Sequence, residues 1–329
     1  MRSLYISQQG CSVSLQKEFI LIKQQQTLLQ QVQLPFIEQI LLFGQSQITT
    51  QAVRACLWRN IPILYLSQMG QCYGRLLPLA HSYRALARRQ HNLTATARLT
   101  TAQAIVQAKL HNSRVLLLRQ QRRPTVPPLT SAIQGLDYLH HRAAQATTIE
   151  QLLGFEGAGA ACYFAAFGQC LTHPELQFTE RTRRPPQDPV NAMLSFGYQL
   201  LWNHLFSLIE LRGLDPYDAC LHQGSDRHAA LVSDLIEAFR APLIDSLVLY
   251  LVNRASIKTT DFDYPATGGC YLNATGRKRF LHAFLQRMET PIQTPDGEQP
   301  RWALLNQQVK AYKHWVNDPT QPYIPYTIR

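Results

Sequence analysis

Residues 222–237 have the sequence HQGSDRHAALVSDLIE, and our interpretation of the whole chain starts from them. They combine one imidazole, His222, with two carboxylates, Asp234 and Glu237, spaced three residues apart inside an apolar run. Imidazole nitrogen and carboxylate oxygens are ligands for divalent cations. The following residues, AFRAPLIDSLVLYLV, continue a helical pattern. We interpret this stretch as half of a metal-dependent phosphodiester site whose other half lies upstream at Glu156.

A helical wheel leaves a second interpretation of the stretch open. At about 100° per residue, one broad apolar face holds Leu231, Val232, Leu235, Ile236 and Phe239. Asp234 and Glu237 fall together on the opposite side, where a soluble helix also places solvated acids. The pair alone therefore fits an ordinary polar face as well as a metal site. Pro242 ends or kinks the helix, so the phase of Asp245 beyond it is not fixed.

Glu156 precedes a run of small residues, GAGAA at 157–161. Small side chains let another helix backbone approach closely, so a carboxylate at this position would lie where helices meet. The alternative is that Glu156 complements a helix N-terminus, which contributes about 0.3–1 kcal/mol. Thr147, with Glu150 three residues later, predicts a capping box that opens this helix.

The chain has 329 residues, more than a single domain usually contains, so we expect two domains. Residues 1–80 contain short strand-like runs and one helix at TTQAVRACLWRN, followed by a hairpin with Gly70 at its turn. Residues 81–329 follow a period of 3.6, beginning with a long helix from about Ser82 to Arg119. We predict an α+β fold, with a β-rich N-terminal domain for packing or dimerisation and a larger all-α catalytic domain. We expect the last dozen residues to be poorly ordered.

Positive charge points to polyanionic partners. The net charge is +11, and the segment from Arg84 to Arg123 carries nine basic residues and no acidic one. Residues 173–189, HPELQFTERTRRPPQDP, predict a basic surface loop, and a later amphipathic helix also begins with basic residues. A solvated charge run is the default interpretation of each segment. The predicted DNA-binding residues are Arg84, Arg88, Arg89, Arg181, Arg183, Arg184, Arg277 and Lys278.

Several classes of site and location are excluded by the sequence. The seven cysteines have neither CxxC nor CxxxC spacing, which argues against a disulfide framework or a structural zinc site. The chain contains no GxxxxGK[ST] motif, so we expect no P-loop and no nucleotide cofactor. We also expect a cytoplasmic protein without a membrane segment, because no long uncharged apolar run or signal peptide is present. Oxygen ligands with a single imidazole favour Mg²⁺ or Mn²⁺ over zinc.

Several segments of the chain together resemble the CRISPR-associated spacer-acquisition integrases, the first of the universal adaptation proteins. The segments are RRPPQDPVNAMLSFGYQLL, GLDPYDACLH, LVSDLIEAFRAPLID, LLGFEGAGAACYF and GRKRFLHAF, with further similarity at LFGQSQIT, NIPILYLSQMGQCYGRL and QAKLHN. The resemblance covers essentially the whole chain. It implies that Glu156, His222 and Glu237 ligate the metal, with Asp234 as a fourth catalytic residue. PYDACLH departs from the glycine and hydrophobic pair that commonly precede the histidine in the family.

The same resemblance implies a reaction and partners. Two homodimers, joined through a dimer of the second universal adaptation protein, would hold double-stranded DNA and insert it into a CRISPR array. A 3′-hydroxyl would attack a phosphodiester, so no nucleotide cofactor would be consumed; with water as nucleophile the site would act as an endonuclease, including on branched DNA. Whether a reverse transcriptase also participates stays open at the level of sequence. Two alternatives remain: a non-catalytic nucleic-acid scaffold and a stand-alone structure-specific nuclease.

Overall fold

The structure, a computed structural model, describes residues 2–68, 70, 72–79, 83–225, 228–294 and 297–328. Within these ranges it does not describe the side chains of Arg2, Tyr83, Arg84 and Thr294. The predicted DNA contact of Arg84 therefore lies outside the described residues. None of the helices in these ranges is long and apolar enough to cross a membrane.

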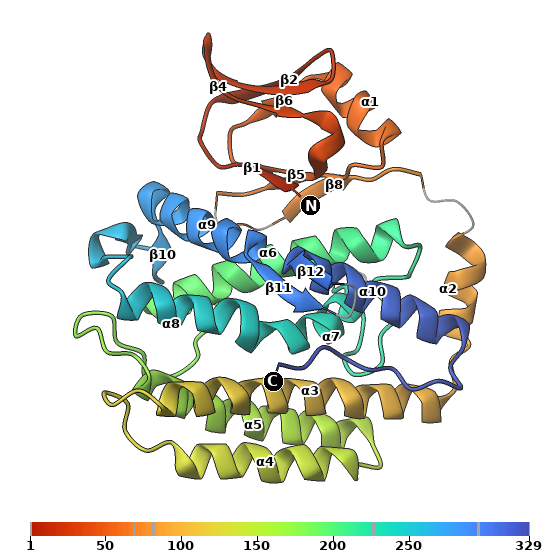
Figure 1. The fold of residues 1–329 in the computed structure, drawn as a ribbon, viewed down its shortest axis with the longest axis vertical. Helices are drawn as coiled ribbons and strands as arrows, with labels where there is room; N and C mark the ends of the chain where they lie inside the picture. Colours follow the sequence, from red (N-terminus) through yellow and green to blue (C-terminus); the bar gives the residue numbers. More distant parts are fainter. Residues whose placement is uncertain are drawn as a thin grey trace.

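The first part of the chain forms two packed sheets and a helix (Figure 1). One sheet has the strand order β1 (Arg2–Ile6), β5 (Ile37–Phe43), β7 (Ile63–Leu66) and β8 (Cys72–Leu76). The other has the order β4 (Thr27–Gln33), β3 (Phe19–Gln24), β2 (Cys11–Gln16) and β6 (Gln47–Ile48). A short 3₁₀ turn, η1 (Leu34–Phe36), precedes β5, and α1 (Thr50–Trp58) begins at Thr49, whose side chain accepts a hydrogen bond from the Ala52 amide. β7 and β8 pair antiparallel, as the hairpin prediction requires.

Strand β5 explains how the β-rich region joins the rest of the molecule. Successive side chains of a strand point to opposite faces of its sheet. Ile40 and Leu42 belong to the core between the two sheets, whereas Leu41 and Phe43 belong to the core of the helical region. The sheet of β1, β5, β7 and β8 is therefore a wall shared by two cores. This is why residues 40–43 of β5, ILLF, form a continuous apolar run instead of an alternating one.

The second part of the chain is mostly helical, which confirms the predicted α+β fold. Its helices are α2 (Tyr83–His91), α3 (Ala95–Gln121), α4 (Thr130–Ala144), α5 (Ile149–Gln169), α6 (Pro189–Leu211), α7 (Ala230–Phe239), α8 (Ser246–Asn253), α9 (Ala274–Glu289) and α10 (Trp302–Asn317). A π-helical turn, η2 (Arg240–Asp245), joins α7 to α8 around Pro242. Short elements that the sequence did not predict are η3 (Thr259–Asp261) and the hairpins β9 (Phe262–Asp263) with β10 (Tyr271–Leu272) and β11 (Pro291–Thr294) with β12 (Gly297–Pro300).

Two predicted helix boundaries are wrong. The stretch up to Arg119 forms two helices, α2 and α3, because the Thr94 side chain accepts a hydrogen bond from the Ala97 amide and starts a new helix. Helix α5 begins one residue later than predicted. Its N-cap is Thr148, which accepts from the Gln151 amide, whereas the Thr147 amide donates to the Gln151 side chain. In both cases a threonine outside the predicted cap makes the deciding hydrogen bond.

The described C-terminal residues pack onto the helical core, so the prediction of a poorly ordered end is wrong for them. Tyr323 and Ile328 are buried. The Ile328 amide donates to Asn112 Oδ1 at 2.9 Å, and Asn112 Nδ2 donates to the Tyr326 carbonyl at 3.0 Å. Asn112 lies on α3, and Figure 1 shows the C-terminal segment passing beside that helix.

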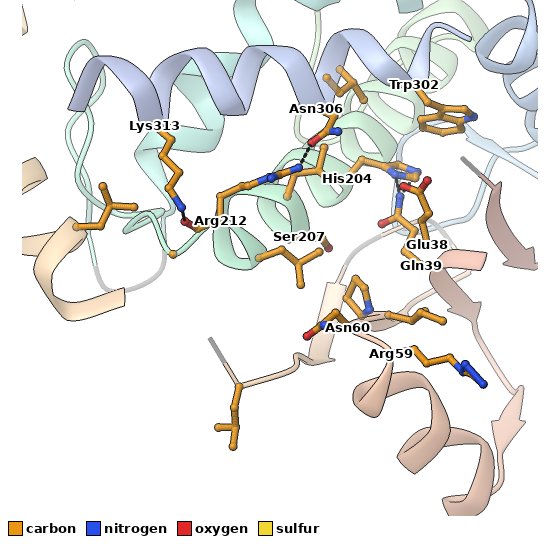
Figure 2. A pocket seen from close by; sticks show the side chains of 18 of the residues that line it. Glu38, Gln39, Arg59, Asn60, His204, Ser207, Arg212, Trp302, Asn306 and Lys313 are labelled. Atoms are coloured by element: carbon orange, nitrogen blue, oxygen red, sulfur yellow. Dashed lines mark hydrogen bonds between the residues drawn. The ribbon is translucent and has the colours of Figure 1, made fainter. Parts of the chain in front are cut away.

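A cavity of about 840 Å³ lies at the junction between the β-rich and helical regions. Figure 2 shows its lining, including His204 of α6 beside Gln39 of β5 and Trp302 of α10. His204 is buried; its Nδ1 hydrogen-bonds to Gln39 Nε2 and its Nε2 to the Tyr5 hydroxyl. Its ring centroid lies 4.5 Å from that of Trp302. One uncharged imidazole thus links both regions.

The burial of His204 predicts that the free energy of unfolding depends on pH. Burial lowers the pKa of His204 from 6.5 to about 3. The unfolded chain therefore binds this proton at higher pH than the folded chain does, and stability is lost as pH falls from about 6.5 toward 3. We expect His204 to contribute about 2–4 kcal/mol to the fall in the free energy of unfolding across this window.

Urea unfolding at about pH 7 and about pH 4.5 measures this contribution. His204→Gln should show a smaller loss of stability between the two pH values than the wild type, whereas His282→Gln, on the exposed surface of α9, should match the wild type. Identical losses for His204→Gln and wild type would contradict the prediction.

Candidate active site

Helix α7 carries Asp234 and Glu237 and is buried along its whole length. Asp234 is 1% exposed and Glu237 is 3% exposed. The interpretation of these acids as a solvated polar face is therefore wrong. The wheel considers one helix, whereas α7 packs against both α3 and α6 (Figure 1). Buried carboxylates require hydrogen bonds or cations, so their partners define the site.

Asp234 organises the turn that leads into α7. Its Oδ2 accepts hydrogen bonds from the amides of Cys220 and Leu221 at 2.8 and 2.9 Å. Its Oδ1 accepts one from the His222 amide at 3.0 Å and lies 2.8 Å from His222 Nδ1. Asp234 therefore fixes both the backbone and the ring of His222, and leaves Nε2 as the nitrogen with which the ring can ligate a cation. The residues of the unusual PYDACLH turn are thus held by a carboxylate.

The pKa of His222 reflects this pairing. Burial lowers it, but the hydrogen bond and the negative charge of Asp234 outweigh burial, so the pKa is raised from 6.5. A protonated ring is a donor at both nitrogens and cannot ligate a cation. Ligation by His222 therefore requires loss of its proton, which an approaching cation favours.

Glu237 pairs with two cations. Its Oε2 lies 2.6 Å from Lys109 Nζ of α3, and its Oε1 lies 3.1 Å from Arg240 Nε. Burial raises the pKa of Glu237, but the positive charges of Arg240 and Lys109 lower it by more, so the pKa falls from 4.5 to about 2. Glu237 is therefore ionised across the physiological pH range. Its buried Oε2 has no hydrogen-bond partner of acceptable geometry among the described residues, although the Lys109 ammonium lies beside it.

Lys109 also forms an ion pair with Glu156 Oε1. Glu156 lies on α5 beyond its first turn, so the alternative of a helix N-terminal acid does not apply. The small residues after it allow the predicted close approach, because a Cβ atom at Gly159 would collide with Leu110 of α3. The ammonium of Lys109 thus lies between the carboxylates of Glu156 and Glu237.

The three predicted metal ligands come together at one cavity of about 660 Å³. Glu156, His222 and Glu237 line it along with Lys109, while Asp234 supports His222 from behind. Two carboxylates and one imidazole are a donor set that suits Mg²⁺ or Mn²⁺. As they stand, the described residues contain no group of three or more His, Cys, Asp or Glu side chains that could hold a metal ion. The donor types fit such an ion, but the ammonium of Lys109 occupies the place between the two carboxylates.

The predicted basic loop contributes to the same cavity. Arg181, Arg183 and Arg184 all line it. Arg181 donates to Asn191 Oδ1 at 2.7 Å and to Ser195 Oγ at 3.0 Å, which fixes the loop on α6. Arg183 and Arg184 are exposed. Two arginines are thus free to contact a phosphate backbone at the edge of the cavity, while the first one holds the loop in place.

Four other predicted DNA-binding residues whose side chains are described do not line this cavity: Arg88, Arg89, Arg277 and Lys278. Arg88 is exposed on α2, and Lys278 is exposed on α9. Arg89 donates to Asn317 Oδ1 at 2.6 Å and lines the junction cavity. Arg277 is buried and donates to the Leu272 carbonyl at 2.7 Å. The structure thus gives Arg89 and Arg277 intramolecular contacts, and it leaves Arg88 and Lys278 on the surface.

Lys109 and Arg240 were missed as site residues. A signal for Arg240 existed, because it follows Glu237 by three residues on a helical pattern. The Arg240 guanidinium also lies 4.6 Å from the ring centroid of Tyr198, whose hydroxyl donates to Asp245. Lys109 gave no comparable signal, because it was one of many basic residues in an acid-free segment. Only the packing of α3 against α5 and α7 brings it to the carboxylates.

Asp245, whose phase the sequence left open, lies behind these residues. It is buried and accepts hydrogen bonds from the hydroxyls of Tyr163 at 2.8 Å and Tyr198 at 2.5 Å. Burial raises the pKa of Asp245. The two phenols satisfy its oxygens, so it supports Tyr198 beside Arg240, and it is not among the residues that line the cavity of about 660 Å³.

Sequence comparison decides the family. The family described as "CRISPR associated protein Cas1" matches residues 4–286. The chain belongs to the Cas1 family. The Cas1 protein of Chlorobaculum tepidum named "CRISPR-associated endonuclease Cas1 1" is 31% identical, over 100% of this chain and 99% of its own length. A "CRISPR-associated exonuclease Cas4/endonuclease Cas1 fusion" of Geobacter sulfurreducens is 35% identical over 89% of this chain, which covers 54% of the fusion.

Two solved structures have the same arrangement of helices and strands as this chain. The "Cas6-RT-Cas1--Cas2 complex" superposes with a TM-score of 0.84 and 24% identity, covering 100% of this chain and 36% of that one. A "Casposase bound to integration product" gives 0.83 and 21% identity, covering 99% and 93% of the two chains. At these identities the likeness establishes the arrangement of elements. The site residues are assigned from the chain itself.

Proposed function

We propose that this Cas1-family chain is a CRISPR adaptation integrase and a metal-dependent DNA endonuclease. It would insert short DNA into a CRISPR array by attack of a 3′-hydroxyl on a phosphodiester. The observation that carries the proposal is that Glu156, His222 and Glu237, from separate segments, line one cavity with a buried, charge-paired interior. A buried carboxylate with a perturbed pKa in a cavity, such as Glu237, is typical of functional sites, because such a group costs stability.

Glu156, His222 and Glu237 would hold Mg²⁺ or Mn²⁺. When bound, such an ion polarises a phosphoryl oxygen and lowers the pKa of an attacking hydroxyl or water. The chain's own residues prepare the site for this chemistry. Asp234 orients the His222 ring, Arg240 holds one oxygen of Glu237, and Lys109 keeps the two carboxylates from repelling each other.

The exposed guanidinium groups of Arg183 and Arg184 would bind phosphates at the cavity edge and align the scissile bond. In the transfer, a 3′-hydroxyl oxygen bonds to phosphorus, the existing phosphorus–oxygen bond of the target strand breaks, and the proton passes from attacking to leaving oxygen. The number of phosphodiester bonds is unchanged, so no nucleotide cofactor is consumed. With water as nucleophile, the same residues would support endonuclease cleavage.

The comparisons also support the proposed partners. One neighbour is a complex named for Cas6, a reverse transcriptase, Cas1 and Cas2, and another is bound to an integration product. We assign this chain a homodimer, a Cas2-type partner bridging two dimers, and double-stranded or branched DNA as substrate. Residues 1–80 would mediate dimerisation and residues 81–329 catalysis. A reverse transcriptase is proposed as an additional partner.

A strand-transfer assay tests the function. A labelled duplex with free 3′-hydroxyls is incubated with a repeat-containing plasmid, the chain and its Cas2-type partner, in EDTA and over a titration of Mg²⁺ or Mn²⁺. We expect covalent joining of the label to the plasmid only with metal. A non-catalytic scaffold would give no product at any metal concentration, and a stand-alone nuclease would cleave branched DNA without joining.

Loss of Arg183 and Arg184 should weaken DNA binding. The double variant Arg183→Gln/Arg184→Gln loses two exposed charges at the cavity edge. The slope of log affinity against log salt should become shallower by about 1–2, because each phosphate contact contributes about 0.9. Fluorescence anisotropy with a labelled duplex at several salt concentrations measures this slope. Arg54→Gln, exposed on α1, is the charge-matched control; an equal change in that variant would contradict the assignment.

A further inference from the structure

A second cavity, of about 920 Å³, lies away from the candidate active site. It is bounded by the C-terminal end of α3, by η2 and α8, by the end of α9 with β11, by the start of α10, and by residues 326–328. None of its described lining residues lines the cavity that contains Glu156, His222 and Glu237. Its size falls within the usual range for small-molecule sites, about 300–1,000 Å³.

Among the described residues that line this cavity, every charged side chain is positive. Four arginines line it, Arg119, Arg123, Arg287 and Arg301, and no aspartate or glutamate occurs among its described lining residues. Arg287 donates to the Ser246 hydroxyl, and Arg301 donates to the carbonyls of Arg287 and Thr290, each at 3.1 Å. The hydroxyl and carbonyl groups orient the guanidinium groups of Arg287 and Arg301, but they carry no negative charge that would neutralise them. Burial, together with the nearby charge of Arg301, lowers the pKa of Arg287 to about 10.

The cavity also contains an unsatisfied polar group. Gln120 of α3 is 8% exposed, and its Oε1 has no hydrogen-bond partner among the described residues. A buried acceptor without a donor costs free energy. Beside it, apolar walls come from Leu116, Leu243, Leu249 and Leu304, and phenol rings from Tyr250 and Tyr326. The lining therefore offers cations, an amide and apolar surface to one ligand.

We propose that this cavity binds a nucleotide, with its arginines around the phosphates and Gln120 on the nucleoside. Phosphate matches the planar donors of several arginines. The base and sugar supply donors for an amide oxygen and a flat apolar body for the leucine and tyrosine walls. The nucleotide can be free in solution or part of a DNA strand, because both present the same phosphate and base. The site is distinct from the proposed active site, since the two share no lining residue in the part of the chain that the structure describes.

Calorimetric titrations in EDTA and low salt test the proposal, because EDTA removes divalent metal from the candidate active site. The probes are ATP, inorganic tripolyphosphate and a short single-stranded oligonucleotide. The double variant Arg123→Gln/Arg301→Gln should bind ATP or the oligonucleotide about tenfold or more weakly than the wild type. Arg122→Gln is the matched control, because Arg122 adjoins Arg123 and is exposed but does not line the cavity. It should change affinity less than about twofold.

Gln120→Leu separates recognition of the nucleoside from recognition of phosphate, and thermal melting of each variant verifies folding. This variant should weaken binding of ATP and leave binding of tripolyphosphate unchanged.

The arginine double variant distinguishes the two sources of the nucleotide. A tenfold weaker binding of ATP identifies the ligand as a free nucleotide, and a tenfold weaker binding of the oligonucleotide alone identifies it as part of a DNA strand. Absence of saturable binding of both probes by the wild type, or equal losses in Arg122→Gln and the double variant, would overturn the proposal. Equal weakening of ATP and tripolyphosphate by Gln120→Leu would contradict the role given to Gln120.

Discussion

Glu237→Ala is expected to reduce strand transfer by about a thousandfold or more, which corresponds to about 4 kcal/mol of transition-state stabilisation. The reason is that Glu237 supplies an ionised carboxylate at a position that is 3% exposed, where water cannot replace it. Glu156→Ala and His222→Ala should have losses of similar size, because each removes another donor from the same cavity. The measurement is the rate of joining of a labelled 3′-hydroxyl duplex at saturating Mg²⁺ or Mn²⁺.

DNA affinity is the control for these variants. The three residues lie inside the cavity, whereas Arg183 and Arg184 at its edge are exposed, so anisotropy titrations should show nearly unchanged binding. Glu175→Ala removes an exposed acid from the basic loop and should retain wild-type strand transfer. Wild-type rates in His222→Ala with either metal would show that the ligand assignment is wrong.

Lys109→Met is expected to destabilise the metal-free protein by about 3–5 kcal/mol, because it leaves two carboxylates facing each other without their shared cation. Lys109, Glu156 and Glu237 have side chains that are 14%, 18% and 3% exposed, so solvent screens this repulsion little. The melting temperature in EDTA should fall by about 6–15 °C. Mn²⁺ should then raise it more in the variant than in the wild type, since the ion no longer competes with an ammonium.

Differential scanning calorimetry with and without Mn²⁺ measures both effects. Lys278→Met removes an exposed lysine from α9 and should leave both melting temperatures unchanged. A Lys109→Met protein that melts like the wild type in EDTA would show that the ammonium does not stabilise the carboxylates. An equal rise with Mn²⁺ in both proteins would show that it does not compete with the metal.

The fold could be predicted where local signals and tertiary packing agree. Helix α1 forms within the predicted segment TTQAVRACLWRN, and the apolar runs of residues 1–76 form strands, because each run fits a pleated, buried surface. The break between α2 and α3 was not predicted, since helix-forming residues flank it on both sides. Only the hydrogen bond made by the Thr94 side chain decides it.

The candidate site was predictable in part. The residue types of His222, Asp234 and Glu237 indicated a metal site, but their spacing fitted a solvated face equally well. The packing of α7 against α3 and α6 buries both acids and decides between these two interpretations. The sequence of α7 alone does not show this packing. The hydrogen bonds from the Cys220 and Leu221 amides to Asp234 depend on a turn conformation that the sequence does not specify.

The burial of charged site residues lowers the stability of the fold, so we infer that these residues serve the function of the protein. Glu237 has Lys109 and Arg240 as partners, yet its Oε2 lacks a well-aligned donor among the described residues. Charged groups held in such a place often destabilise a fold relative to apolar residues of similar volume. That oxygen has the Lys109 ammonium beside it at 2.6 Å, and we propose that a divalent cation would take the place of the ammonium when it binds.

Direct binding of Mn²⁺, measured by electron paramagnetic resonance of the free ion during titration, tests the central claim without DNA. We expect a saturable Mn²⁺ site in the wild-type chain and its loss in the Glu156→Ala/Glu237→Ala variant, with Glu175→Ala unchanged. Mn²⁺ binding of the same affinity and stoichiometry in the double variant would contradict it.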